Sequence, residues 1–192
     1  MTEKSTRDNI VEAAHQLFYE KGFDHTSFAD IADAVNISRG NFYYHFKTKD
    51  DILKAVIDQR MAATRDMLDA WEKEGNTPKE RIRCFIEIMI NNRAKIKKHG
   101  CPVGTLTSEL AKLGHPALGE ANEIFTVFRD WLRRQFEQMG RTKDADELAL
   151  HVLAGSQGIA TLASAFRDDK FIKREVEALG DWLDAVASET DA

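Results

Sequence analysis

One stretch, from Thr26 to Leu53, constrains the fold of this chain more than any other part of the sequence. It reads TSFADIADAVNISRGNFYYHFKTKDDIL. Thr26 is placed to cap a short helix whose apolar residues recur at helical spacing: Phe28, Ile31, Ala32 and Val35. A break at 35–37 follows, and Ser38 can cap a second short helix. Two short helices joined by so tight a turn predict a helix-turn-helix, whose second helix enters the major groove of DNA.

The second short helix carries side chains that suit DNA. Gly40 has no side chain, so the backbone can approach the duplex closely. Arg39 can pair with a guanine edge, Asn41 with an adenine edge, and a tyrosine ring can rest on a thymine methyl group. The donors that commonly hold phosphates follow directly: Tyr43, Tyr44, His45, Lys47 and Lys49.

An alternative interpretation is that the run NFYYHF is simply aromatic core. Phe42 and Phe46 are four residues apart and suffice for a buried stripe, which leaves the two tyrosines and the histidine turned outward. Thr48 with Asp51 has the spacing of a capping box and predicts that a new helix starts there. The residues themselves therefore favour a DNA-binding surface.

Phe23 and the stretch that follows it resemble the DNA-binding domain of the TetR family of transcriptional regulators. The resemblance covers about the first 55 residues, and the glycine, the Phe-Tyr-Tyr-His-Phe run and the Lys-x-Lys pair all stand at the family's spacing. It implies an all-α homodimer with a ligand-controlled second domain. It also implies that the following residues lie at the DNA surface: Thr26, Ser38, Arg39, Gly40, Asn41, Tyr43, Tyr44, His45, Lys47 and Lys49.

The charge balance is unusual for a DNA-binding protein. The net charge is −5, and residues 1–50 hold six Lys and Arg against eight Asp and Glu, a net of −2. Nucleic-acid binding needs a local basic face rather than a basic chain. Arg39, Lys47 and Lys49 cluster in the recognition segment, and Lys4 is a further candidate for a phosphate contact. We expect few phosphate contacts per subunit, so that specificity requires a dimer.

The rest of the chain predicts an all-α protein of about nine helices, with only three prolines. Residues 1–48 form the predicted three-helix DNA-binding domain, and residues 49–192 a helical-bundle domain for ligand sensing and dimerisation. Absence of an 18-residue apolar run predicts no membrane span, and the polar N-terminus is not a secretory signal. Two cysteines make no disulfide framework, which favours a reducing cytoplasm. No cofactor is expected.

Several helix starts are predicted in the second part. Thr77-Pro78 with Glu80 predicts a helix over 78–98. Asp144 with Glu147 is expected to cap a helix that runs to about residue 167, and Asp168 is expected to cap the last helix, to about residue 188.

The last two helices contain a candidate dimer interface. Small residues at 154–158 stand inside a helix, where each glycine costs about 0.5–1 kcal/mol relative to alanine, and they allow another helix to approach closely. The alternative is ordinary packing within one chain. The resemblance favours a homodimer, whose recognition helices would meet successive major grooves about 34–36 Å apart. The predicted interface residues are Gly155, Gly158, Ile159, Leu162, Phe166, Leu179, Leu183 and Val186.

The resemblance also implies an effector pocket in the second domain. Apolar and polar side chains on several helices are candidates to line it, with ordinary core packing as the alternative for each. An amphiphilic or aromatic small molecule is the hypothesis for the ligand. The candidates are Met61, Phe85, Met89, Arg93, Phe125, Phe128, His151 and Gln157.

Cys101 is a separate candidate for sensing. It stands at a predicted helix start with Lys97, Lys98 and His99 nearby, and helix N-termini and cations favour the reactive thiolate. Its segment, GCPVGTLTSEL, resembles a Gly-Cys segment in one branch of TetR-like repressors, some of which sense oxidants through that cysteine. The alternative is a small side chain that fills space.

Two other classes of function remain open on the sequence. An activator has the same DNA-binding signature as a repressor. A thiol- or metal-dependent enzyme is disfavoured, because the six histidines show no strong metal-ligand spacing and no phosphate loop or nucleophile elbow occurs.

Overall fold

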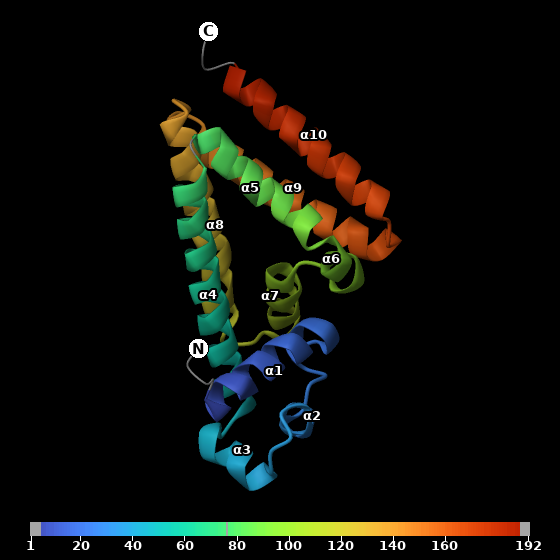
Figure 1. Ribbon diagram of the computed structural model, residues 1–192. Coiled ribbons are helices and arrows are strands. Elements are labelled where there is room, and N and C mark those ends of the chain that lie inside the picture. The colour runs from blue at the N-terminus through green and yellow to red at the C-terminus, as the bar shows by residue number, and fades with distance from the viewer. Residues whose placement is uncertain (1–4, 76, 189–192) are drawn as a thin grey trace. The chain divides into compact units, whose positions relative to one another are not determined.

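The structure is a computed structural model that describes residues 5–75 and 77–188. Within these ranges it contains ten helices and no strand, which confirms the predicted all-α fold class (Figure 1). Lys4 lies outside the described residues. The chain forms two compact units, one of Met1–Ala63 with Thr105–Asn122, the other of Thr64–Gly104 with Glu123–Ala192. The first unit therefore extends beyond the boundary predicted at residue 48 and takes in a distant segment.

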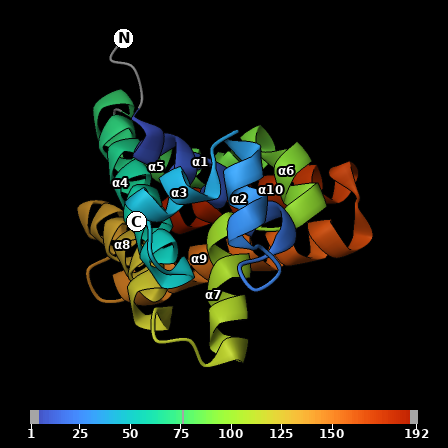
Figure 2. The ribbon, with the colours of Figure 1, turned by 90° about the horizontal axis from the view of Figure 1, so that it is seen from below.

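The first unit is built on three short helices, α1 (Thr6–Lys21), α2 (Phe28–Ala34) and α3 (Arg39–His45), which lie beside one another in both views (Figures 1 and 2). Three other helices contribute only part of their length to it: α4 (Lys49–Glu74), α7 (Pro102–Leu113) and α8 (Leu118–Gln138). Its core is made of large apolar side chains that are almost wholly buried: Ile10, Ile31, Phe42, Phe46, Ile52 and Leu53.

The helix caps in this unit agree with the sequence at Ser38 and Thr48 but not at Thr26. The Ser38 hydroxyl accepts a hydrogen bond from the Asn41 N–H, and Thr48 forms a reciprocal box with Asp51. The prediction that Thr26 caps α2 is wrong, because the next residue, Ser27, caps it in a reciprocal box with Asp30. The Thr26 hydroxyl instead donates to the Gly22 carbonyl at 2.7 Å.

The second unit is a bundle in which α10 (Asp169–Ser188) packs closely on α5 (Pro78–Asn91) and α9 (Ala145–Phe166), as Figure 1 shows. The helix predicted over 78–98 is divided at Asn92, and its second part is α6 (Arg93–His99). Asn92 leaves helical geometry at φ −104° and ψ 13°, and its side chain donates to the Ile88 carbonyl at 3.0 Å. Local bonds of this kind between an asparagine side chain and the backbone compete with helix propagation.

The predicted cap of α9 is wrong in its chemistry. Asp144 stands at the N-cap position but makes no side-chain capping bond. Its carboxylate is bound by the Arg141 guanidinium, which lowers the pKa of Asp144. Asp168, by contrast, accepts from the Lys170 N–H at 2.8 Å at the start of α10, as predicted.

A polar cluster centred on the buried side chain of Gln135 joins the C-terminal end of α4 to α5 and α8. Gln135 is fully buried; its amide nitrogen donates to Glu72 at 2.6 Å and its amide oxygen accepts from Arg81 at 3.3 Å. Arg81 also forms an ion pair with Glu72 at 2.9 Å and donates to the Gly75 carbonyl at 3.0 Å. The cluster fixes the end of α4 against its neighbours in the second unit.

Among the described residues, one helix, α9, is long and apolar enough to cross a membrane by length and composition alone. Of the most apolar 18-residue stretch of α9, 39% is buried in the structure. A core helix of a soluble protein can have the same length and apolar composition. In this structure α9 packs against α5, α6 and α10, so part of its apolar surface is already covered by protein.

Candidate nucleic-acid interface

The recognition helix α3 separates an apolar side from a polar one. Phe42 is 1% exposed, whereas Tyr43 is 45% and Tyr44 is 79% exposed. Arg39, Gly40 and Asn41 at its start are also exposed, and nothing lies within 4 Å of where a Cβ on Gly40 would stand. The helix therefore offers its N-terminal residues and both tyrosines to solvent, which is the arrangement a groove-reading helix requires.

The buried side of α3 is held by aromatic contacts. The rings of Phe28 and Phe42 are 5.1 Å apart, and Phe28 also meets Tyr43 edge-on at 5.5 Å. The guanidinium of Arg7, on α1, lies 4.8 Å over the ring of Phe46, the residue that follows α3. An apolar cavity of about 220 Å³ borders the recognition helix between α2 and α3, lined by Ser27, Phe28, Ala29, Ala32, Arg39, Phe42 and Tyr43. These ring contacts pack α3 directly against α2.

The predicted DNA-contact residues differ in how available their polar groups are. Arg39 and Lys47 are exposed, and the Lys47 ammonium reaches the Tyr43 carbonyl. Lys49 is half-buried, with its ammonium 3.1 Å from the Asp24 carbonyl and 4.3 Å from the centre of the Phe23 ring. The remaining predicted contacts, Ser38 and His45, are exposed and half-buried respectively.

Thr26 is only 1% exposed. Its side chain therefore does not reach the surface, and the exposed cap residue Ser27 takes the place that the sequence assigned to it. The Ser-x-x-Asp spacing of Ser27 and Asp30 is the signal that the sequence interpretation missed. Asp30 also pairs with Lys21 at 3.3 Å, so this carboxylate is partly neutralised.

Glu109 on α7 is a residue of this unit that sequence reasoning missed entirely. Its two carboxylate oxygens accept hydrogen bonds from the backbone N–H groups of Phe23 and Asp24, at 2.9 and 2.8 Å. Partners 86 and 85 residues apart leave no periodic signal in a sequence. The contact is visible only in the fold.

The predicted dimer residues fall into two groups. Ile159, Leu179, Leu183 and Val186 are buried within the single chain. Leu162 and Phe166 are 43% and 66% exposed, Gly158 is exposed with open space beside it, and Gly155 faces Leu179. The exposed group lies on one face of α9 together with Leu150 and Ala154, two residues absent from the prediction.

The predicted ligand residues are also divided. Phe85, Met89 and Phe128 are buried, and the rings of Phe85 and Phe128 meet at 5.4 Å. Met61 and Phe125 are half-buried. Arg93 is exposed and donates to the Ile90 carbonyl, and His151 is exposed and stacks on Trp182 with ring centres 4.4 Å apart. The predicted ligand residues therefore differ in their burial within the single chain.

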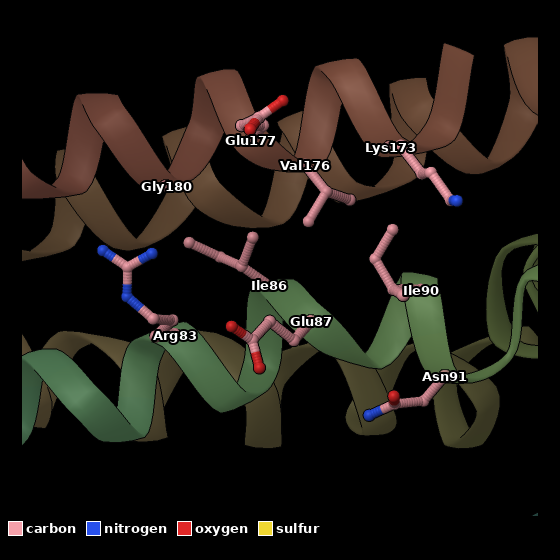
Figure 3. Close-up of a pocket in the computed structure, with 9 residues that line it drawn as sticks. All are labelled: Arg83, Ile86, Glu87, Ile90, Asn91, Lys173, Val176, Glu177 and Gly180. Carbon is pink, nitrogen blue, oxygen red and sulfur yellow. The ribbon is translucent and has the colours of Figure 1, made fainter. Parts of the chain in front are cut away.

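A groove of about 410 Å³ runs between α5 and α10 (Figure 3). Its lining residues are Arg83, Ile86, Glu87, Ile90, Asn91, Lys173, Val176, Glu177 and Gly180. Arg83 points toward Gly180, where a Cβ would stand 3.1 Å from the guanidinium, and it pairs with Asp184 at 2.6 Å. None of the predicted ligand residues lines this groove.

Cys101 immediately precedes α7 and is half-buried. Its sulfur accepts hydrogen bonds from the Gly104 N–H and from the Gln157 side-chain amide, both at 3.5 Å. The predicted ligand residue Gln157 thus meets the predicted sensing residue Cys101. The described residues contain no cluster of three or more His, Cys, Asp or Glu that could hold a metal ion.

Comparison with known proteins agrees with this architecture. Residues 10–56 match the family model "Bacterial regulatory proteins, tetR family", and residues 78–178 match "Transcriptional regulator LmrA/YxaF-like, C-terminal domain". An HTH-type transcriptional regulator of Lactococcus lactis is 30% identical over 125 residues, 64% of either chain. The regulator TtgR of Pseudomonas putida is 26% identical over 195 residues, covering 94% of this chain and 89% of TtgR.

A solved TetR regulator of Legionella pneumophila has the same fold, with a TM-score of 0.83 at 24% identity over 97% of this chain and 99% of that one. The two family models together span the exposed recognition helix and most of the second unit. The chain therefore belongs to the TetR family of transcriptional regulators, which are DNA-binding proteins and not enzymes.

Proposed function

We propose that this chain is a homodimeric repressor that binds a palindromic operator in the cytoplasm and leaves it when a small ligand binds or when Cys101 is modified. The observation that carries the DNA-binding part is the division of α3, with Phe42 buried against α2 while Tyr43 and Tyr44 are exposed. A bound repressor acts by occupying DNA that the transcription machinery needs.

The test is selection of bound duplexes from a random DNA library, at physiological salt with competitor DNA. We expect enrichment of a palindrome whose half-sites are one helical turn apart or a multiple of it. Tyr44→Ala, which removes an exposed ring, should weaken binding to that palindrome. Failure of reduced, refolded protein to enrich any sequence would contradict the proposal.

The dimer proposal rests on one face of α9. Leu150, Ala154, Gly158, Leu162 and Phe166 recur every four residues, and all five are exposed in the single chain. An apolar stripe of this length, with its smallest residue at the centre, suits a second helix that crosses at Gly158. It also accounts for the membrane-like composition of α9 without a membrane.

Sedimentation velocity tests the dimer. Leu162→Glu should shift the chain toward monomer and weaken operator binding, because a charge at the stripe cannot be buried without a partner. Arg134→Glu, at an exposed position of α8, is the matched control and should leave the dimer intact. Equal sedimentation of the Leu162→Glu variant and the wild type would show that this stripe of α9 is not the dimer interface.

Two routes of release are proposed because two sets of side chains support them. The buried aromatic pair Phe85 and Phe128 suits an apolar ligand, whereas the two hydrogen bonds to the Cys101 sulfur suit a reactive thiol. Iodoacetamide should release the wild type and the Cys84→Ser control from the operator but not Cys101→Ser. Release of all three proteins, or of none, would exclude Cys101. In a screen of hydrophobic compounds, one that binds the second unit should raise the thermal unfolding midpoint of the protein.

A further inference from the structure

We propose that Glu109 is a positioning residue for operator recognition: its carboxylate fixes the turn between α1 and α2, and through it the register of the recognition helix α3. The two oxygens each accept one backbone N–H, from Phe23 at 2.9 Å and from Asp24 at 2.8 Å. Two consecutive amides bound by one carboxylate define the orientation of the turn, because hydrogen bonds to an ionised acceptor are short and directional.

Gly22 makes room for this contact. Its φ of +94° lies in the region that glycine adopts without strain, and a Cβ there would stand 3.0 Å from one Glu109 oxygen and 3.2 Å from the other. A side chain at position 22 would therefore push the carboxylate away from the amides. The turn is shaped around Glu109.

The other side of the turn is held independently. The Phe23 ring is buried, with the rings of Phe18 and His115 edge-on at 5.2 Å each. The Lys49 ammonium lies 4.3 Å over the same ring and donates to the Asp24 carbonyl at 3.1 Å. Asp24 thus donates its N–H to Glu109 and accepts from Lys49 at its carbonyl, so the two peptide groups that flank its Cα are both held.

The turn bound by Glu109 leads directly into α2, which contacts the recognition helix α3. Only residues 24–27 separate Phe23 from the start of α2, and α2 carries α3 through the contact of Phe28 with Phe42 at 5.1 Å. A shift of the turn therefore moves both helices together. Since base readout depends on hydrogen-bond geometry and phosphate binding depends mainly on charge, such a shift should weaken specific binding more than non-specific binding.

The direction of the change in operator affinity distinguishes a positioning role of Glu109 from a simple effect of its charge. Glu109→Gln removes a negative charge from the DNA-binding unit, which by electrostatics alone strengthens binding to any DNA. Its amide can accept only one of the two N–H groups and turns an N–H₂ donor toward the other. Glu109→Asp keeps the charge but is one methylene too short to reach both amides. Glu120→Gln is the matched control, because that carboxylate lies in the same unit and pairs with the exposed Lys54 side chain at 3.4 Å.

The experiment has two arms on the full-length protein. In the first, without DNA, native hydrogen exchange of residues 23–46 should accelerate in Glu109→Gln and Glu109→Asp but not in Glu120→Gln. In the second, affinity for the selected operator should fall about tenfold or more in both Glu109 variants, as expected for a lost charge-assisted hydrogen bond, with affinity for random duplex unchanged or higher.

The second arm rests on the proposed function, whereas the first does not, so the two can fail separately. Wild type that enriches no operator would refute the proposed function, and exchange would still decide the role of Glu109. Unchanged exchange in both Glu109 variants would overturn the inference. So would faster exchange with full operator affinity, since Glu109 would then only stabilise the turn. A loss in Glu109→Gln alone would trace the effect to the new amide and overturn it as well.

Discussion

Replacing Gln135 by methionine tests how much the polar cluster of buried Gln135 with half-buried Glu72 and Arg81 stabilises the second unit. Methionine has nearly the same length but neither donates nor accepts strongly. The change removes the 2.6 Å bond to Glu72 and the 3.3 Å bond from Arg81. Each is a hydrogen bond to a charged group and contributes about 1.5–3 kcal/mol.

Burial of an apolar side chain in place of an amide offsets part of that loss, so we expect the free energy of unfolding to fall by about 2–4 kcal/mol. For a chain of this size, about 2–4 °C of midpoint is lost per kcal/mol, which places the shift at about 5–15 °C. Urea and thermal unfolding at fixed protein concentration measure both quantities.

Gln138→Met is the matched control. Gln138 stands on the same helix, is exposed, and accepts one bond from Arg81 at 3.2 Å. Because water replaces that bond readily, this variant should cost less than about 0.5 kcal/mol. If Gln135→Met is no more destabilising than Gln138→Met, the reasoning about the polar cluster is wrong.

Three further predictions concern stability, pH and thiol reactivity. Leu183→Ala truncates a fully buried side chain of α10 and should cost about 2–5 kcal/mol in urea unfolding; a loss below 1 kcal/mol would show that the site collapses around the cavity. The Ser27 hydroxyl and N–H lower the pKa of Asp30 from 3.8 to about 2. Its contribution to stability is therefore complete above about pH 5 and is lost as the pH falls towards 2. Asp30→Asn should flatten the acid limb of a stability–pH curve measured by circular dichroism. Burial, with nearby carboxylates, raises the pKa of the Cys84 thiol, so iodoacetamide at neutral pH should label Cys101 first, as peptide mass spectrometry would show; equal rates would contradict this.

The fold was largely predictable because its signals are local. Helical spacing and the Ser38 and Thr77 caps depend on residues within one or two turns of each other, and the structure has the helices that they predict. The errors are also local. At Thr26 and Ser27 two adjacent hydroxyl residues are candidates for one cap, and the sequence interpretation overlooked the Ser27-x-x-Asp30 spacing that favours Ser27.

The candidate sites were less predictable because they depend on contacts between distant segments. The sequence predicted the burial pattern of the aromatic run in α3 correctly, since burial of Phe42 and exposure of Tyr43 follow from helical periodicity. It assigned Leu183 to a dimer interface, although intrachain packing against other helices buries it completely. An apolar side chain looks the same in a sequence whether its neighbours come from one chain or two.

The division of the chain carries a consequence for how such regulators diversify. The polypeptide passes from one compact unit to the other at residues 63–64, 104–105 and 122–123. A single recombination point after the helix-turn-helix would combine the DNA-binding helices of one protein with segment 105–122 of another. The residue at position 109 would then come from a different protein than the turn that it contacts. Under the proposed role of Glu109, exchange of DNA specificity by one crossover should preserve operator affinity better when the donor has Gly and Glu at the positions of Gly22 and Glu109.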